Sequence, residues 1–166
     1  MNAVLGFLLI TIQMNTLLKK GDKIPEFTLL DQHSEEVKIS PDSGKPMVIY
    51  FYPKDDTPGC TQEACYFRDQ FEVFTDYGAL IIGISGDSPK SHLRFAEKYR
   101  LNFTLLSDGD QKIEKQFGVP RNLFGLLPGR VTFIVDQHGI IQHVFSSQFN
   151  ASQHVEEALE VLKTLE

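Results

Sequence analysis

The chain has 166 residues, of which 42% are apolar and 23% charged, as expected for one globular domain with a core of its own. Its net charge of −6 argues against a nucleic-acid partner, because binding to phosphates needs a basic face. The two cysteines are too few for the disulfide framework of a small secreted scaffold.

The first residues differ from the rest of the chain, because residues 3–12 are apolar except for Thr11. This run is shorter than the roughly 20 apolar residues that span a bilayer. It also lacks the basic start of a signal peptide, since the first basic residue is Lys19. We therefore interpret residues 1–17 as an apolar N-terminal extension of a domain formed by residues 18–166, and we expect a cytoplasmic protein that does not enter a membrane.

The domain begins with two short extended stretches, residues 27–30 and 37–39, joined by the polar turn 31–34. Residues 47–52 are β-branched and aromatic, which predicts a buried strand that ends at Pro53.

Phenylalanines at helical spacing predict a helix over about 61–77, and Gly78 is a suitable helix stop. A second buried strand is predicted over residues 79–85. Either Asp87 or Ser88 can cap the helix that follows this strand.

Residues 103–106 form a short extended segment before a turn and a helix that ends at Phe117. Residues 130–136 and 140–145 flank His138-Gly139 and predict a hairpin. The apolar positions of a final helix are Val155, Leu159 and Leu162. Strands mixed with helices predict an α/β domain with a central mixed sheet and helices on both faces.

Both cysteines lie in PKDDTPGCTQEAC, residues 53–65. Cys60 falls in the first turn of a helix, where unpaired N–H groups and the helix dipole favour the reactive thiolate. Pro58 and Gly59 give a rigid turn followed by a residue that lets the backbone approach a small ligand. Thr57 can direct its hydroxyl at the sulfur or at an oxygen bound beside it. The alternative is an ordinary turn that leads to a core cysteine.

Cys65 is five residues beyond Cys60. On a continuous helix, residues five apart are about 140° around the axis, and their Cα atoms are roughly 8.6 Å apart. A disulfide needs Cα atoms within about 7 Å, so the pair can bond only if the first helical turns unwind. A zinc site is disfavoured because two further ligands are missing. The histidines are scattered and are interpreted as surface or packing residues: His33, His92, His138, His143 and His154.

The stretch Pro53–Cys60 has the peroxiredoxin spacing of Pro, three residues, Thr, two residues, Cys. Its continuation TQEACYFRD, residues 61–69, resembles the peroxiredoxin Q group, also called the bacterioferritin comigratory protein group. The likeness runs from about Leu18 to the C-terminus. Supporting stretches are GIS at 83–85, RFAEKY at 94–99, LLSD at 105–108 and RVTFIVD at 130–136.

This resemblance implies a thioredoxin-like fold and a thiol peroxidase that reduces hydrogen peroxide and organic hydroperoxides. Cys60 matches the peroxidatic cysteine, which becomes a sulfenic acid. Cys65 matches the resolving cysteine, which would close a redox-active disulfide with Cys60. A thioredoxin or a similar dithiol reductant would then regenerate both thiols.

The resemblance also assigns roles to residues around Cys60. Thr57 and Arg130 match the residues that hold the peroxide and stabilise charge as its bond breaks. Glu63 matches a position that orients this network, and Pro53 matches the residue that shields the pocket. No metal or other cofactor is implied, and we expect a monomer.

Two other functions stay open at this point. One is a disulfide oxidoreductase of protein thiols, although that class uses cysteines two residues apart. The other is a thiol-bearing binding or chaperone module without enzymatic activity. Peroxide consumption by the purified protein separates the three.

Overall fold

The structure is a computed structural model that describes residues 16–122 and 124–165. Seven strands form one sheet in the order β2-β1-β5-β4-β3-β8-β9. They are β1 Phe27–Asp31, β2 Glu36–Ile39, β3 Met47–Phe51, β4 Leu80–Ser85, β5 Thr104–Ser107, β8 Val131–Val135 and β9 Ile141–Ser146. A small second sheet pairs β6 Arg121–Asn122 with β7 Leu127–Pro128. The helices are α1 Pro58–Asp69, α2 Phe71–Asp76, α3 Pro89–Tyr99, α4 Lys112–Phe117 and α5 Ala151–Lys163.

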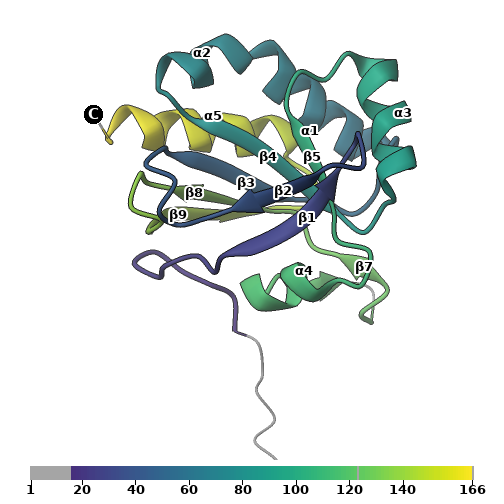
Figure 1. The fold of residues 1–166 in the computed structure, drawn as a ribbon, viewed down its shortest axis with the longest axis horizontal. Coiled ribbons are helices and arrows are strands. Elements are labelled where there is room, and N and C mark those ends of the chain that lie inside the picture. Colours follow the sequence, from purple (N-terminus) through teal and green to yellow (C-terminus); the bar gives the residue numbers. More distant parts are fainter. Residues whose placement is uncertain (1–15, 123, 166) are drawn as a thin grey trace, which may run out of the picture.

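The seven-stranded sheet is mixed, as the sequence predicts. Strand β3 pairs in parallel with β4 and antiparallel with β8, and β4 pairs in parallel with β5. Helices α1, α2, α3 and α5 cover one face of the sheet, and α4 covers the other (Figure 1). The predicted arrangement of helices on both faces is therefore confirmed.

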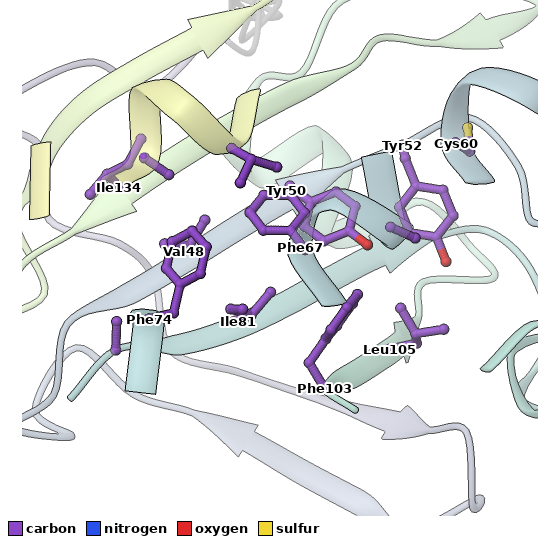
Figure 2. Close-up of a cluster of buried hydrophobic side chains, with 14 of the residues drawn as sticks. Val48, Tyr50, Tyr52, Cys60, Phe67, Phe74, Ile81, Phe103, Leu105 and Ile134 are labelled. Carbon is purple, nitrogen blue, oxygen red and sulfur yellow. The ribbon is translucent and has the colours of Figure 1, made fainter. Parts of the chain in front are cut away.

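Strand β3 contributes to the core on both faces, because side chains alternate along a strand. Tyr50 faces the cluster under α1 and α5, and Ile49 faces the second cluster, which includes residues of α4. Tyr50 stacks on Phe67 of α1 with ring centroids 4.7 Å apart. Cys60 lies at one edge of the same cluster (Figure 2). The contacts of Tyr50 and Phe67 therefore fix α1, and with it Cys60, against the sheet.

The helix predicted over residues 61–77 is two helices in the structure. Helix α1 starts earlier, with Pro58 in its first turn, and ends at Asp69, and Gln70 separates it from α2, which begins at Phe71. Proline suits the first turn because its missing N–H would have no helical partner there.

The N-terminal extension predicted for residues 1–17 lies outside the described residues except at its last two positions. The backbone N–H of Leu18 donates to the carbonyl of Phe117, which ties the start of the domain to the end of α4. Over the described part of the chain, no helix has the length and apolar character needed to cross a membrane.

Candidate active site

Cys60 lies in the first turn of α1, as the sequence predicts, and its side chain is buried. Strand β3 ends at Phe51, which pairs with Val131 at the start of the antiparallel strand β8. Arg130 directly precedes β8, so this pairing brings it to the edge of the sheet where the chain turns into α1. Its Nη2 atom donates to the Sγ atom of Cys60 at 3.3 Å.

Arg130 is buried, and its guanidinium contacts three groups at once. Besides Cys60, Nη1 donates to Oε1 of Glu63 at 3.0 Å, and Nε donates to the carbonyl of Gln148 at 3.3 Å. Burial opposes the charge, but the neighbouring Glu63 and Cys60 outweigh it and raise the pKa of Arg130 above its ordinary value. The site therefore holds a fixed positive charge next to the sulfur.

Glu63 is on the same helix as Cys60 and has no exposed surface. Burial raises the pKa of its carboxyl group to about 8, although Arg130 acts in the opposite direction. Its second oxygen, Oε2, lies 3.5 Å from Nδ1 of His154 on α5.

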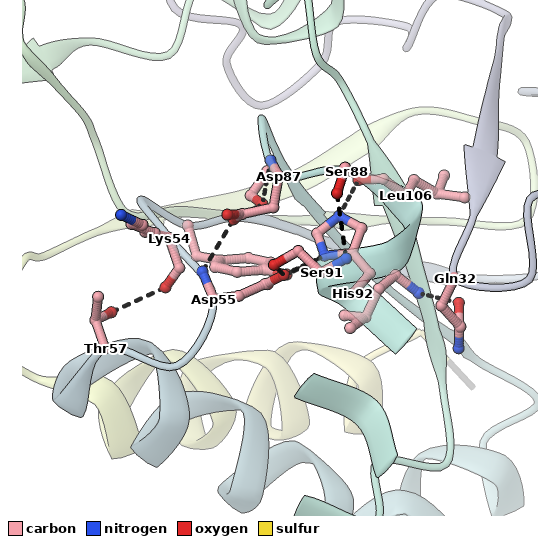
Figure 3. A network of polar contacts seen from close by, with 12 residues as sticks. Gln32, Lys54, Asp55, Thr57, Asp87, Ser88, Ser91, His92 and Leu106 are labelled. Atoms are coloured by element: carbon pink, nitrogen blue, oxygen red, sulfur yellow. Dashed lines mark hydrogen bonds and ion pairs between the residues drawn. The ribbon is translucent and has the colours of Figure 1, made fainter. Parts of the chain in front are cut away.

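Thr57 and Pro53 lie in the loop between β3 and α1, and both are partly buried. The hydroxyl of Thr57 donates to the carbonyl of Lys54 at 2.9 Å (Figure 3). Because this bond uses the hydroxyl hydrogen, the lone pairs of the oxygen remain to accept a hydrogen bond. Thr57 can therefore serve a peroxide O–H as an acceptor. The shielding role of Pro53 stays a prediction.

A buried polar network fixes this loop to α3 (Figure 3). Nδ1 of His92 lies 2.8 Å from Asp55, and Nε2 lies 3.1 Å from the carbonyl of Leu106. Tyr52 donates its hydroxyl to Asp55 at 2.6 Å. Asp87 accepts from the backbone N–H of Asp55, so three acidic and imidazole side chains meet here. Their facing atoms already have partners in the chain, and the network holds the loop.

Sequence reasoning placed His92 and His154 among surface or packing residues. The structure shows both fully buried, with both ring nitrogens of each in polar contacts. Their partners come from other elements, and no local pattern around either histidine identifies them.

Cys65 is partly buried on α1, and both cysteines are free thiols. They lie on one uninterrupted helix. Ideal helix geometry keeps their Cα atoms roughly 8.6 Å apart, beyond disulfide range.

Gly59 lies directly against Arg130. A Cβ atom at this position would come within 2.9 Å of Nη2 of Arg130. We expect Gly59→Ala to displace the guanidinium from Cys60 and to slow peroxide reduction by roughly tenfold or more, since small misplacements in active sites carry large rate effects.

The matched control is Gly109→Ala, where a Cβ would have no neighbour within 4 Å. Stopped-flow measurement of peroxide reduction compares the two variants. Equal rates for both would mean that the contact between residue 59 and Arg130 does not matter to the reaction.

A buried thiol at the start of a helix, beside a buried arginine on a mixed α/β sheet, is an arrangement suited to thiol-dependent redox chemistry. A model of the AhpC/TSA family matches residues 20–144. A chloroplastic peroxiredoxin Q of Populus jackii is 51% identical over 148 residues, which cover 89% of this chain and 70% of the relative. One of Sedum lineare is 52% identical over 146 residues, covering 88% of this chain and 78% of the relative. The chain therefore belongs to the AhpC/TSA family and, within it, to the peroxiredoxin Q group of thiol-dependent peroxidases.

Solved structures agree with this assignment. Peroxidoxin BcpB from Mycobacterium tuberculosis matches with a TM-score of 0.83 and 39% identity, over 90% of this chain and 99% of that chain. A peroxiredoxin Q from Xanthomonas campestris matches with a TM-score of 0.76 and 34% identity, over 83% of this chain and 90% of that chain. These matches confirm the predicted thioredoxin-like fold.

The expectation of a cytoplasmic protein is wrong. It rested on the absence of a recognisable targeting pattern near the N-terminus. The plant relatives at about 50% identity are named chloroplastic, which points to a plastid instead.

Proposed function

We propose that this protein is a thioredoxin-dependent peroxidase that uses Cys60 as the peroxidatic thiolate and Cys65 as the resolving thiol. The observation that carries the proposal is the 3.3 Å contact between Nη2 of Arg130 and Sγ of Cys60, at the start of a helix that also bears Cys65. The guanidinium of Arg130 and the N-terminal end of α1 both stabilise negative charge on the sulfur, and the thiolate is the form that attacks peroxides. The names of the plant relatives support a plastid as its location.

The first step forms a bond between sulfur and the terminal peroxide oxygen as the O–O bond breaks. The thiolate becomes a sulfenic acid, and the leaving oxygen takes the bonding electrons and then a proton to become water or an alcohol. Arg130 stabilises the charge on the leaving oxygen, and the Thr57 hydroxyl accepts the peroxide O–H. Glu63 orients the guanidinium through Oε1.

In the second step, the Cys65 thiolate attacks the Cys60 sulfenic acid, forms the disulfide and releases hydroxide, which is protonated to water. The two sulfurs can meet only after the first turns of α1 unwind. Two exchange steps with a dithiol such as thioredoxin then transfer the disulfide to the reductant and restore both thiols. This scheme needs only one chain, because both cysteines are on the same helix, and a monomer is sufficient for it.

We expect Cys65→Ser to be oxidised once by a hydroperoxide but to lose continuous turnover with thioredoxin and its reductase. Without Cys65 the sulfenic acid has no resolving thiol on the helix. Mass spectrometry should detect the sulfenic acid with a trapping reagent. An assay coupled to thioredoxin and its reductase should show no sustained consumption of the nicotinamide electron donor of that reductase. Sustained turnover of Cys65→Ser at the normal rate would remove Cys65 from the mechanism.

Hydrogen exchange of the unsubstituted protein tests the unwinding in a separate experiment. Amides from about Cys60 to Tyr66 should exchange faster in the disulfide form than in the dithiol form, because local opening exposes them. Amides of β3 and β4 should not change, and they provide the internal control. Equal protection of α1 in both forms would contradict the unwinding step.

A further inference from the structure

His154 on α5 is the centre of a buried network behind the Cys60 site. Its Nδ1 atom lies 2.8 Å from the hydroxyl of Thr132, and its Nε2 atom lies 2.8 Å from the carbonyl of Ser147. The same Nδ1 atom is 3.5 Å from Oε2 of Glu63. The histidine therefore contacts the carboxyl group that orients the catalytic arginine.

These contacts define where the hydrogen of the His154 ring lies. A carbonyl oxygen only accepts, so Nε2 carries the hydrogen and donates it to Ser147. Burial lowers the pKa of His154 to about 4, so the ring is neutral near pH 7 and Nδ1 presents a lone pair. The hydroxyl of Thr132 donates to this lone pair, and Oε2 of Glu63 faces it as well.

The two oxygens of Glu63 have different surroundings. Oε1 accepts from Arg130, whereas Oε2 has no hydrogen-bond partner among the described residues. A carboxylate oxygen facing the lone pair of a neutral imidazole is repelled by it, whereas the O–H of a carboxylic acid is attracted. Burial acts in the same direction, since it raises the pKa of Glu63 to about 8.

The protonation state of Glu63 affects how the charge of Arg130 acts on Cys60. Arg130 carries the one positive charge among the described groups that face Glu63. The other titratable neighbours of Glu63 are Tyr50 from β3 and His154 from α5, and Cys60 on α1 contacts the same arginine. Burial raises the pKa of Tyr50 well above its ordinary value, so its phenol is neutral. A Cys60 thiolate and a Glu63 carboxylate would therefore compete for the same buried cation.

We propose that His154 is a positioning residue that keeps Glu63 as a neutral acid, so that the charge of Arg130 stabilises the Cys60 thiolate alone. The inference rests on the proposed roles of Cys60 and Arg130. It adds a residue from α5 to the site and assigns a protonation state to Glu63. It also predicts that the reaction slows at alkaline pH, because an ionised Glu63 competes with the Cys60 thiolate for the positive charge of Arg130.

Infrared difference spectroscopy of the reduced protein tests the protonation state without any activity measurement. Isotope labelling of glutamate, with Glu63→Gln as the reference, identifies the carbonyl band of a protonated Glu63. The band should be present at pH 7 and disappear around the pKa of about 8. A Glu63 that is already ionised at pH 7 overturns the inference.

Stopped-flow kinetics tests the role of His154 with two variants that each replace only one of its two ring nitrogens. His154→Gln can still donate to Ser147 but lacks the acceptor that faces Glu63. His154→Asn keeps an oxygen near the position of Nδ1 but cannot reach Ser147. Near-ultraviolet circular dichroism confirms that both variants are folded.

The rate of peroxide reduction by the normal protein should fall several-fold between about pH 7 and pH 9.5, as Glu63 ionises. In His154→Gln the fall should occur about one pH unit lower, because the lone pair that repels the carboxylate form of Glu63 is absent. In His154→Asn its position should be unchanged, and in Glu63→Gln the fall should be absent. If the rate falls over the same pH range in His154→Gln as in the unsubstituted protein, the role of His154 is overturned.

The outcomes also separate this inference from the proposed function. If the normal protein does not consume peroxide, the proposed function fails while the infrared band still reports on Glu63. If peroxide is consumed but Glu63 is ionised at pH 7, only the inference about Glu63 and His154 fails.

Discussion

Cys60→Ser is expected to lower peroxide reduction by at least about 1,000-fold, the scale on which enzymes lose activity when their nucleophile is removed. A serine hydroxyl is far less acidic than a thiol, so Arg130 and the start of α1 cannot supply a nucleophilic anion from it. Cys65 cannot replace Cys60, because it lies more than a helical turn further along α1 than the thiol that Arg130 contacts.

The decisive measurement is hydroperoxide consumption in the presence of excess dithiol. Cys65→Ser is the matched control, because it removes one thiol from the same helix and should still reduce one equivalent of peroxide. Substantial peroxide consumption by a folded Cys60→Ser protein would show that the nucleophile is elsewhere.

Arg130→Met should slow the second-order reaction with peroxide by about 100- to 1,000-fold, the range measured when one donor to a developing oxyanion is removed. Methionine roughly retains the apolar length of the arginine side chain. It removes the contacts to Cys60, Glu63 and Gln148 together.

Arg130→Lys separates charge from geometry, because lysine retains the charge but has no planar fork. We expect it to be only partly active. Arg94→Met on the exposed face of α3 serves as the control for loss of one positive charge. A rate for Arg130→Met equal to that of Arg94→Met would exclude Arg130 from the site.

The core of the fold could be predicted because its strands have strong local signals. Residues 47–52 are all bulky and apolar or aromatic, and β3 is buried along its whole length. A turn between two apolar stretches predicts the hairpin around His138-Gly139, and in the structure β8 and β9 form this hairpin. Such signals depend only on neighbouring residues, so one sequence is enough to read them.

The break between α1 and α2 could not be predicted in the same way. Phe67, Phe71 and Phe74 keep helical spacing across Gln70, so the periodic pattern continues where the helix ends. The backbone of Gln70 leaves the helical region with φ −99° and ψ 7°. The pattern of apolar side chains gives no sign of this break in the helix.

Local sequence patterns and the family resemblance predicted part of the site, and the rest depends on contacts between distant segments. The pattern around Cys60 predicts a reactive thiol at a helix start, and the structure places it there. Its contact with Arg130 depends on the pairing of β3 with β8, and only the resemblance pointed to it. His154 and His92 escaped notice because their partners come together only in the folded chain.

The position of Glu63 on α1, between the two cysteines, links the redox state of the cysteines to the arrangement of the peroxide site. In the proposed mechanism, the unwinding that brings Cys65 to Cys60 also moves Glu63 away from Arg130, because Cys60, Glu63 and Cys65 lie within the same two turns of α1. If the mechanism is as proposed, the disulfide form and the assembled peroxide site are mutually exclusive states of one helix. A molecule that has reacted once would then have to be reduced and to refold α1 before it receives a second peroxide, and the fold itself would set the order of the two substrates.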